Sequence, residues 1–142
     1  MKITVTGGKG GTGKTLVAIS LATYFSIFGK NVLLMDCDVD SPNISLLLNV
    51  KLSNKQEVKV FFPSFNPDKC SYCGKCSEVC PEKAILSVKN KLPIVFPKIC
   101  TGCEACKIVC PEDAINDDYK TVGWTYEAKI GRINIVSGEL KI

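Results

Sequence analysis

Residues 7–15 are a glycine-rich stretch that ends in a lysine and a threonine. Their spacing fits the phosphate-binding template G-x-x-x-x-G-K-[ST]. Glycines let the backbone curl so that successive N–H groups point at one phosphate, and the Lys14 ammonium would neutralise the outer phosphates. The Thr15 hydroxyl would complete the coordination shell of a Mg²⁺ ion. The predicted phosphate-binding residues are Gly8, Lys9, Gly10, Gly11, Thr12, Gly13, Lys14 and Thr15.

The same stretch also contains the pattern G-x-G-x-x-G that is typical of dinucleotide-binding sites, and Asp36 follows about 20 residues later. The pair Lys14–Thr15 favours the phosphate loop, because a dinucleotide site has no use for a lysine and a hydroxyl at the start of its helix. A nicotinamide-dependent oxidoreductase is therefore kept as an alternative, and it would bind NAD more tightly than ATP.

Eight of the nine cysteines lie in two identical frames that are 30 residues apart. Each frame reads C-x₂-C-x₂-C-x₃-C-P, which is the ligand spacing of bacterial ferredoxins with two [4Fe–4S] clusters. In that spacing three closely spaced thiolates bind one cluster, and the fourth binds the other. The predicted ligands are Cys70, Cys73, Cys76 and Cys110 for the first cluster and Cys100, Cys103, Cys106 and Cys80 for the second.

Two zinc sites are the competing interpretation of these frames, because paired C-x-x-C motifs are also typical of zinc ribbons. The third cysteine at equal spacing and the proline after the fourth favour iron–sulfur clusters. Disulfides are disfavoured, because the sequence has no secretory signal. The ninth cysteine, Cys37, is expected to be a small buried thiol beside the nucleotide site.

Asp36 and Asp38 follow a predicted strand at residues 31–35. Carboxylates at the carboxyl end of such a strand face the ligand crevice of an open α/β sheet, where they can bind Mg²⁺ or orient an attacking water. The alternative is that these aspartates only cap a turn. The predicted catalytic residues are Lys9, Lys14, Asp36 and Asp38.

The elements that must position these residues follow from hydrophobic patterning. Residues 2–6 predict a buried first strand, and residues 14–28 predict a helix that Gly29 ends. With the strand at 31–35 they would form a βαβ unit. Ser41 is expected to cap a short helix through Leu48.

In the second half of the chain the pattern predicts strands and a boundary between them. Residues 58–62 predict a connecting strand, and residues 63–67 predict a boundary rich in proline. After the cysteine frames, residues 122–130 alternate between apolar and polar side chains, and residues 133–140 are expected to return as the partner strand of a hairpin.

Composition narrows the class of protein. The chain has 142 residues, of which 46% are hydrophobic and 23% charged, as in a globular protein. The formal charge of +4 is misleading, because two clusters held by eight thiolates would add about four negative charges. Nucleic-acid binding is therefore not expected. The most apolar helix is too short to span a membrane, and a cytoplasmic location is expected.

Residues 9–15 resemble the deviant Walker A motif of the MinD/ParA/Mrp and nitrogenase-iron-protein ATPases, whose signature is an additional lysine where Lys9 stands. Residues 36–38 resemble the second motif of that family. The resemblance implies binding of ATP or ADP with Mg²⁺. It implies that Lys9 reaches the phosphates of a second copy in a homodimer, and that Asp38 activates the hydrolytic water.

The order of the motifs resembles MinD-type ATPases with an inserted ferredoxin domain. The predicted fold class is α/β, a partial P-loop parallel sheet with an inserted ferredoxin-like 2[4Fe–4S] α+β domain and a C-terminal β-hairpin. Residues 1–58 are the nucleotide-binding segment, residues 59–117 the ferredoxin domain, and residues 118–142 the returning hairpin. The family's later segment, which carries the switch II/Walker B aspartate, is missing, so the chain is expected to be a fragment, half of a split protein or a truncated product.

The leading hypothesis is a protein that couples ATP binding or hydrolysis to electron transfer through two [4Fe–4S] clusters. Whether it is an ATPase is left open. One alternative is a ferredoxin-like electron carrier with an inactive nucleotide half, and another is an iron–sulfur cluster carrier or assembly ATPase. The expected partners are a redox protein and either a second copy or a complementary C-terminal half.

Overall fold

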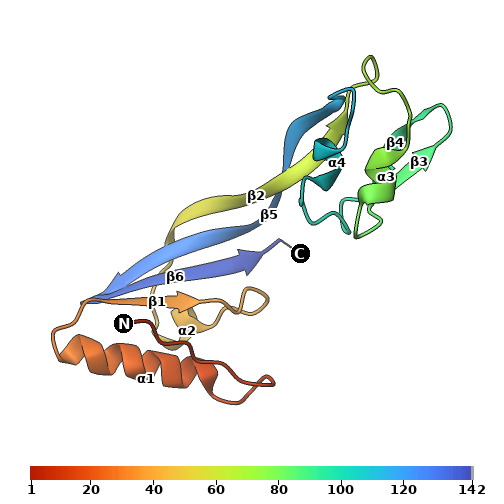
Figure 1. Ribbon diagram of the computed structural model, residues 1–142. Helices are drawn as coiled ribbons and strands as arrows, with labels where there is room; N and C mark the ends of the chain where they lie inside the picture. The colour runs from red at the N-terminus through yellow and green to blue at the C-terminus, as the bar shows by residue number, and fades with distance from the viewer. Residues whose placement is uncertain (142) are drawn as a thin grey trace. The chain divides into compact units, whose positions relative to one another are not determined.

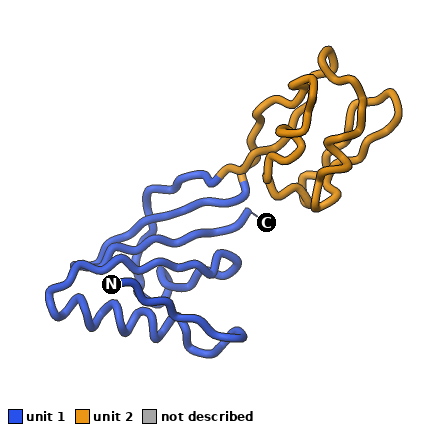
Figure 2. Tube along the Cα trace, in the orientation of Figure 1, with its two compact units in different colours: residues 1–58, 122–142 blue, residues 59–121 orange. Residues whose placement is uncertain are grey.

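The computed structural model describes residues 1–141, which fold as two compact units (Figure 2). Unit 1 contains residues 1–58 and the described residues from 122 onward. Unit 2 contains residues 59–121. Unit 1 therefore carries the glycine-rich loop, and unit 2 carries both cysteine frames.

Figure 1 shows the elements in chain order. The helices are α1 (Lys14–Ile27), α2 (Ile44–Leu47), α3 (Lys75–Val79) and α4 (Ala105–Ile108). The strands are β1 (Val32–Asp36), β2 (Ser53–Phe65), β3 (Ile85–Val88), β4 (Lys91–Val95), β5 (Ile115–Ile130) and β6 (Ile133–Leu140).

Four strands form one sheet in the order β1-β6-β5-β2. β1 pairs with β6 in parallel, with Val32 opposite Ile133. β5 and β6 form an antiparallel hairpin that turns between Ile130 and Ile133, as the alternating pattern predicted. The architecture is mixed α/β with a parallel pair in its sheet, which is consistent with a P-loop domain. β3 and β4 form a separate two-stranded sheet in unit 2.

The predicted helix at residues 14–28 is confirmed, with glycine at both of its ends. Gly13 precedes the helix with φ of 82°, and Gly29 follows it with φ of 78°. Glycine adopts this left-handed conformation without the steric cost that a Cβ would bring. The helix is apolar on most sides, yet only Ala22 is fully buried, so part of its apolar surface has no cover within unit 1.

The first predicted strand, at residues 2–6, is wrong. The structure has no strand there, and a cavity of about 430 Å³ lies between this segment, α1 and β1. Its lining includes Ile3, Val5, Phe25 and Leu34. A strand needs a neighbour for its N–H and C=O groups, and the cavity stands where a neighbour would have to be. The expected pairing of this segment with β1 is therefore absent, and β1 pairs with β6 on its other edge.

Two further boundaries also differ from the prediction. The short helix begins at Ile44 after Asn43, not after Ser41, because its first N–H groups are bonded to the Asp36 carboxylate. β2 runs through Pro63 to Phe65, so the proline-rich stretch does not interrupt the strand. Among residues 1–141, no helix combines the length and apolarity needed to cross a membrane.

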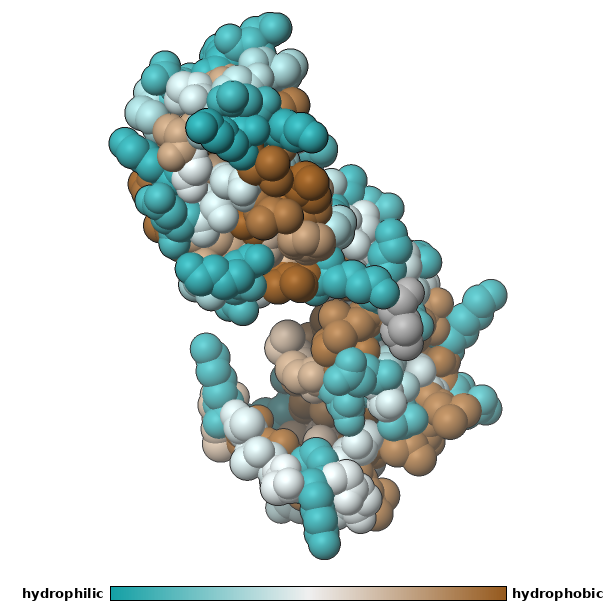
Figure 3. Space-filling view, turned by 90° about the vertical axis from the view of Figure 1, so that its right-hand side faces the viewer, coloured by the Kyte–Doolittle hydropathy of each residue, from teal (hydrophilic) through white to brown (hydrophobic). Residues whose placement is uncertain are grey.

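Each unit has its own core. In unit 1 the core consists of Ala22, Leu34, Ile44, Ile133 and Ile135. In unit 2 the core includes cysteine side chains beside Phe61, Ala84, Ile85 and Ile115. Large apolar side chains also remain exposed, and the face drawn in Figure 3 shows brown apolar surface on both units.

The exposed apolar side chains of unit 1 include two residues of β1. Leu33 and Met35, on the face of β1 opposite Leu34, are 60% and 57% exposed. Burial of a leucine-sized side chain is worth about 1.5–3 kcal/mol. These two side chains of β1 are therefore apolar surface that unit 1 leaves exposed.

Candidate functional site

The glycine-rich loop folds back on itself before α1. The Lys14 Nζ and the Thr12 hydroxyl each donate a hydrogen bond to the Lys9 carbonyl oxygen, both at 3.2 Å. A Cβ on Gly7 would lie 2.8 Å from the Thr12 Oγ1, so a larger residue there would force the Thr12 side chain to move. Of the predicted loop residues, Lys9, Thr12 and Lys14 are thus joined by hydrogen bonds, next to the first turn of α1.

Four glycines of this loop face open space. A Cβ placed on Gly8, Gly10, Gly11 or Gly13 would meet nothing within 4 Å. Gly11 also has a left-handed φ of 74°, which favours glycine. An anion could enter beside these residues and meet backbone N–H groups at the positive end of α1.

α1 and β1 place the loop and the aspartates at the same end of unit 1. α1 has 14 residues and β1 has five, which correspond to about 21 Å and about 17 Å. Because Gly29 reverses the chain between these elements of similar length, the start of α1 and the end of β1 lie at the same end (Figure 1). The loop after β1 is also tied to β6, since the Leu140 N–H donates to the Val39 carbonyl at 3.0 Å.

Asp36 is buried, with 8% of its surface exposed, and its carboxylate is already engaged. Its Oδ2 accepts hydrogen bonds from the backbone N–H groups of Asn43 and Ile44 at 3.0 and 3.1 Å, and its Oδ1 accepts one from Asp38 at 3.2 Å. These bonds cap α2 and fix the loop. The geometry therefore supports the turn-capping alternative for Asp36 over a direct role at the phosphates.

The neighbours of Asp36 are exposed. Asp38 is exposed, and its backbone C=O accepts a hydrogen bond from the Ser41 N–H at 3.2 Å. Cys37 is also exposed, so the expectation of a buried thiol is wrong. The reason is the strand alternation, which turns Asp36 inward and its neighbour outward.

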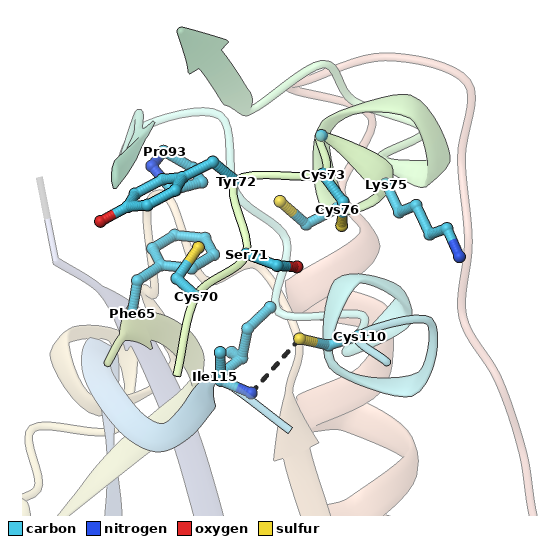
Figure 4. Close-up of a pocket in the computed structure, with 12 residues that line it drawn as sticks. Phe65, Cys70, Ser71, Tyr72, Cys73, Lys75, Cys76, Pro93, Cys110 and Ile115 are labelled. Carbon is cyan, nitrogen blue, oxygen red and sulfur yellow. Dashed lines mark hydrogen bonds between the residues drawn. The ribbon is translucent and has the colours of Figure 1, made fainter. Parts of the chain in front are cut away.

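In unit 2, four cysteines line one cavity. Figure 4 shows the sulfur atoms of Cys70, Cys73, Cys76 and Cys110 around a common space, with Phe65 and Ile115 beside them. These four are the set predicted for the first cluster. Three come from the first repeat, and the fourth comes from the second.

A second cavity has the reciprocal composition. Its lining includes the four cysteines predicted for the second cluster, together with Phe61 and Ile85. Those cysteines are Cys80, Cys100, Cys103 and Cys106. All nine cysteines lie in the described part of the chain, and each is a free thiol.

The repeat in the sequence is also a repeat in the backbone. The Asn66 N–H donates to the Ala114 carbonyl at 2.8 Å, and 30 residues on the Phe96 N–H donates to the Ala84 carbonyl at the same distance. Left-handed backbone positions also recur 30 residues apart. These are Tyr72 and Gly102, Gly74 and Glu104, and Lys83 and Asp113. The two halves therefore fold alike and exchange hydrogen bonds with each other.

The last cysteine of each frame accepts a hydrogen bond that sequence reasoning missed. The Ala84 N–H donates to the Cys80 Sγ, and the Ala114 N–H donates to the Cys110 Sγ, both at 3.3 Å. Hydrogen bonds to cysteine sulfurs are one of the factors that set the potential of an iron–sulfur cluster. The signal was present in the sequence as an Ala-Ile pair at the same distance after each Cys-Pro.

Burial shifts the titration of the central cysteine in each frame. Burial raises the pKa of the Cys76 thiol, and it raises the pKa of Cys106 to about 11, where the neighbouring thiols at Cys100 and Cys103 add to the effect. Both groups are thus protonated near neutral pH when no metal is bound. Metal binding must release these protons, because a cysteine binds metal as its thiolate.

Each cavity offers four thiol donors that could hold a cluster or a single ion. Four thiolates around one zinc, at about 2.3 Å each, must lie within about 4 Å of one another. In a [4Fe–4S] cluster each thiolate binds a different iron, so the sulfurs stand further apart around a larger group. Four thiols lining an apolar cavity fit the cluster.

Comparison with known proteins finds one family model and several relatives that match this chain. The model of a family described as the CobQ/CobB/MinD/ParA nucleotide binding domain matches residues 3–137. An uncharacterized protein of Methanocaldococcus jannaschii, MJ0578, is 42% identical over 87 residues, which are 60% of this chain and 30% of that protein. Its aligned region is too long to lie within the glycine-rich loop and α1 alone.

Two relatives with informative names match shorter regions. An iron-sulfur cluster carrier protein of M. jannaschii is 42% identical over 50 residues, 35% of this chain and 17% of that protein. The septum site-determining protein MinD of Bacillus subtilis is 39% identical over 49 residues, 34% of this chain and 18% of that protein. The aligned part of this chain covers less than a third of the length of each of these three relatives.

Proposed function

The chain belongs to the CobQ/CobB/MinD/ParA nucleotide-binding domain family, and we propose that it couples ATP binding to electron transfer through two [4Fe–4S] clusters. Unit 1 would bind ATP or ADP with Mg²⁺ at residues 8–15. Unit 2 would hold the two clusters. When bound, such clusters accept and donate one electron at a time, at potentials between about −700 and +450 mV.

The observation that carries the proposal is the pair of four-cysteine cavities. Each cavity takes three cysteines from one repeat and one from the other, which is the ligand exchange of ferredoxins with two clusters. The same arrangement would join the two halves of unit 2 through the clusters. A small unit gains much of its stability from such a link.

In the nucleotide site, different side chains would bind the phosphates, the Mg²⁺ ion and the water. Lys14 can leave the Lys9 carbonyl for a phosphate, since a charge-assisted hydrogen bond to an anion is stronger than one to a neutral oxygen. Thr15 would hold Mg²⁺. Lys9, on the exposed loop, would reach the phosphates bound by a second copy, and Asp38 would face the terminal phosphate and water.

The partners follow from the same surfaces. We propose a redox protein that docks on unit 2, and a homodimer or a complementary polypeptide half that completes unit 1. The cavity between residues 1–5, α1 and β1, together with the exposed Leu33 and Met35, supports the second form. A further strand could pair with the open edge of β1 there.

One relative's name favours a second candidate function. The iron-sulfur cluster carrier protein of M. jannaschii matches 35% of this chain. If this chain also delivered clusters, its clusters would be labile and would move to an acceptor protein. Enclosure of each cavity by both repeats makes release harder, so electron transfer remains the first candidate.

The test is anaerobic purification with counts of iron and sulfide, followed by titration with ATP and ADP. The proposal predicts about eight irons per chain and saturable binding of both nucleotides. The same iron content without nucleotide binding would support an electron carrier with an inactive nucleotide half. Zinc, or no metal, would contradict the proposal.

A further inference from the structure

The two cysteine cavities have matching backbones but different charged neighbours. Each is built from the same frame, with the reciprocal hydrogen bonds described above. Lys120, however, belongs to β5, beyond the cysteine frames, and the residue 30 positions earlier is the uncharged Asn90. The chain that returns from the second repeat therefore brings a cation to one half only.

Lys120 is fixed against the ligand loop of the second cavity. Its Nζ donates a hydrogen bond to the Cys100 carbonyl oxygen at 2.6 Å and another to the Pro97 carbonyl oxygen. The ammonium also lies 5.6 Å from the centre of the Phe62 ring, within the range of a cation–π contact. The residue is half-buried, so its charge is screened by solvent less than a fully exposed charge.

The other charges at the cavities are more exposed. Glu82 and Glu104 line the second cavity, and Lys75 lines the first. All three are exposed, and the Lys75 side chain points away from the space between the sulfurs in Figure 4. Exposed charges act through water and salt and contribute little. Lys107, next to Cys106, is also half-buried, but its ammonium is paired with the Asp117 carboxylate. Lys120, in contrast, is a half-buried cation hydrogen-bonded to the backbone of a cavity cysteine.

We propose that Lys120 selectively raises the reduction potential of the second cluster, the one assigned to Cys80, Cys100, Cys103 and Cys106. Reduction adds one electron and hence one negative charge to a cluster. A fixed ammonium beside Cys100 stabilises that added charge, and it lies in the half that contains the second cavity. With both clusters bound, a single electron would therefore reside on the second cluster for a larger fraction of the time than it would without Lys120.

This inference rests on the proposed two-cluster function and goes beyond it, because it assigns a direction to the electron. Lys120 would act on the cluster through its charge, and it would not be a ligand. We expect removal of its charge to reduce the one-electron equilibrium constant of the second cluster about three- to tenfold, which corresponds to about 30–60 mV. The first cluster should keep its potential.

The experiment is a potentiometric titration of the iron-loaded full chain, followed by electron paramagnetic resonance at constant pH. The variant is Lys120→Met, and Lys120→Arg keeps the charge. Lys98→Met is the matched control, since Lys98 is exposed and lies in the same loop two residues before Cys100. We expect Lys120→Met to lower one of the two potentials, and Lys120→Arg and Lys98→Met to leave both unchanged.

Two other results are decisive. Clusters that are present but show no shift, or an equal shift of both potentials, would overturn the inference and leave the proposed function standing. Absence of iron in the unmodified chain would overturn the proposed function itself. Should Lys120→Met lose iron through misfolding, Lys120→Gln replaces it, because glutamine still donates hydrogen bonds to the carbonyls without the charge.

Discussion

At the scale of single residues, Lys14 and Asp36 differ in how firmly their charged groups are held. The Lys14 amino group is bonded to one neutral carbonyl of its own loop. The Asp36 carboxylate accepts three backbone N–H groups and is buried. Lys14 is therefore free to move to a phosphate, whereas Asp36 could move only by breaking the start of α2.

Replacing Lys14 by Met tests the first role. The variant loses a charge-assisted hydrogen bond worth about 1.5–3 kcal/mol, so we expect its dissociation constant for ATP to rise about 10- to 100-fold. The measurement is titration with a fluorescent ATP analogue. Lys30→Met removes the same charge at the other end of α1 and should bind as the unmodified chain does. Equal affinity of Lys14→Met and Lys30→Met would contradict the phosphate-loop assignment.

Asp36→Ala tests the second role. Removal of the carboxylate leaves buried N–H groups unpaired, so the free energy of unfolding should fall by about 1–3 kcal/mol. Urea unfolding can be followed by the fluorescence of the single tryptophan, Trp124, which lies in unit 1. Asp38→Ala, at an exposed carboxylate, should change stability little. If the two variants unfold alike, Asp36 does not hold the loop as described.

The rate of cysteine alkylation gives a pH-dependent prediction. The thiolate is the reactive form, and burial raises the pKa of Cys106 to about 11. In the metal-free folded chain its alkylation rate should therefore keep rising as the pH increases from 9 towards 11, because only above that range is the thiol fully ionised. Mass spectrometry of peptides after timed iodoacetamide treatment measures this rate.

The iron-loaded chain is the control for that experiment. Cys37 alone should be alkylated there, since the other eight thiols are assigned to clusters. Fast alkylation of any of those eight in a chain with full iron content would remove that cysteine from the ligand set. A Cys106 rate that levels off at pH 9 in the metal-free chain would show that the thiol is not buried as the structure has it.

At the scale of elements, Tyr72 and Gly102 are a matching pair of left-handed residues in the two frames, and only Gly102 must be glycine. Tyr72 has φ of 56° and Gly102 has φ of 77°. The Tyr72 side chain is 42% exposed. A Cβ on Gly102 would instead lie 2.9 Å from the Phe61 carbonyl oxygen and 3.0 Å from the Val60 Cβ. β2 therefore packs closely against the second repeat at Gly102.

Gly102→Ala should consequently weaken unit 2. A strained left-handed alanine that also contacts β2 costs about 1–3 kcal/mol, which lowers the apparent Tm by several degrees in a domain of this size. Differential scanning calorimetry of the iron-loaded chain measures it. Tyr72→Ala, at the matching position, should leave Tm within about one degree. Equal Tm values for both variants would refute the close approach of β2.

Sequence alone could predict the elements whose signals are local. The helix at α1 has glycine at both ends, the hairpin turns at Gly131, and each cysteine frame is a short run with the same internal spacing. The strand at residues 2–6 could not be predicted correctly, because its formation depends on a neighbour across the cavity. The pairing of β1 with β6 links Val32 to Ile133, far along the chain, and no local pattern specifies it.

The site shows the same division. The four-cysteine groupings follow from spacing, and the structure lines each cavity with the grouped residues. The engagement of Asp36 depends on where the N–H groups of Asn43 and Ile44 come to lie. The contact of Lys120 with the Cys100 carbonyl depends on the path of β5 after both repeats. Residue spacing predicts neither of these two contacts.

At the scale of the whole molecule, one polypeptide carries both a unit with the glycine-rich loop and a unit with the two cysteine frames. β2 and β5 each run from unit 1 into unit 2, so two continuous strands link the units covalently. A change at the nucleotide site could pass along these strands. By thermodynamic linkage, any effect of ATP on the clusters must equal the effect of reduction on ATP affinity.

The most direct test of that coupling is the pair of cluster potentials measured with and without saturating MgATP. We predict that MgATP shifts at least one potential and that MgADP shifts it differently, because the terminal phosphate distinguishes the two states of the loop. Identical potentials in the presence of ATP, of ADP and of no nucleotide, in a chain that binds both, would contradict the central claim.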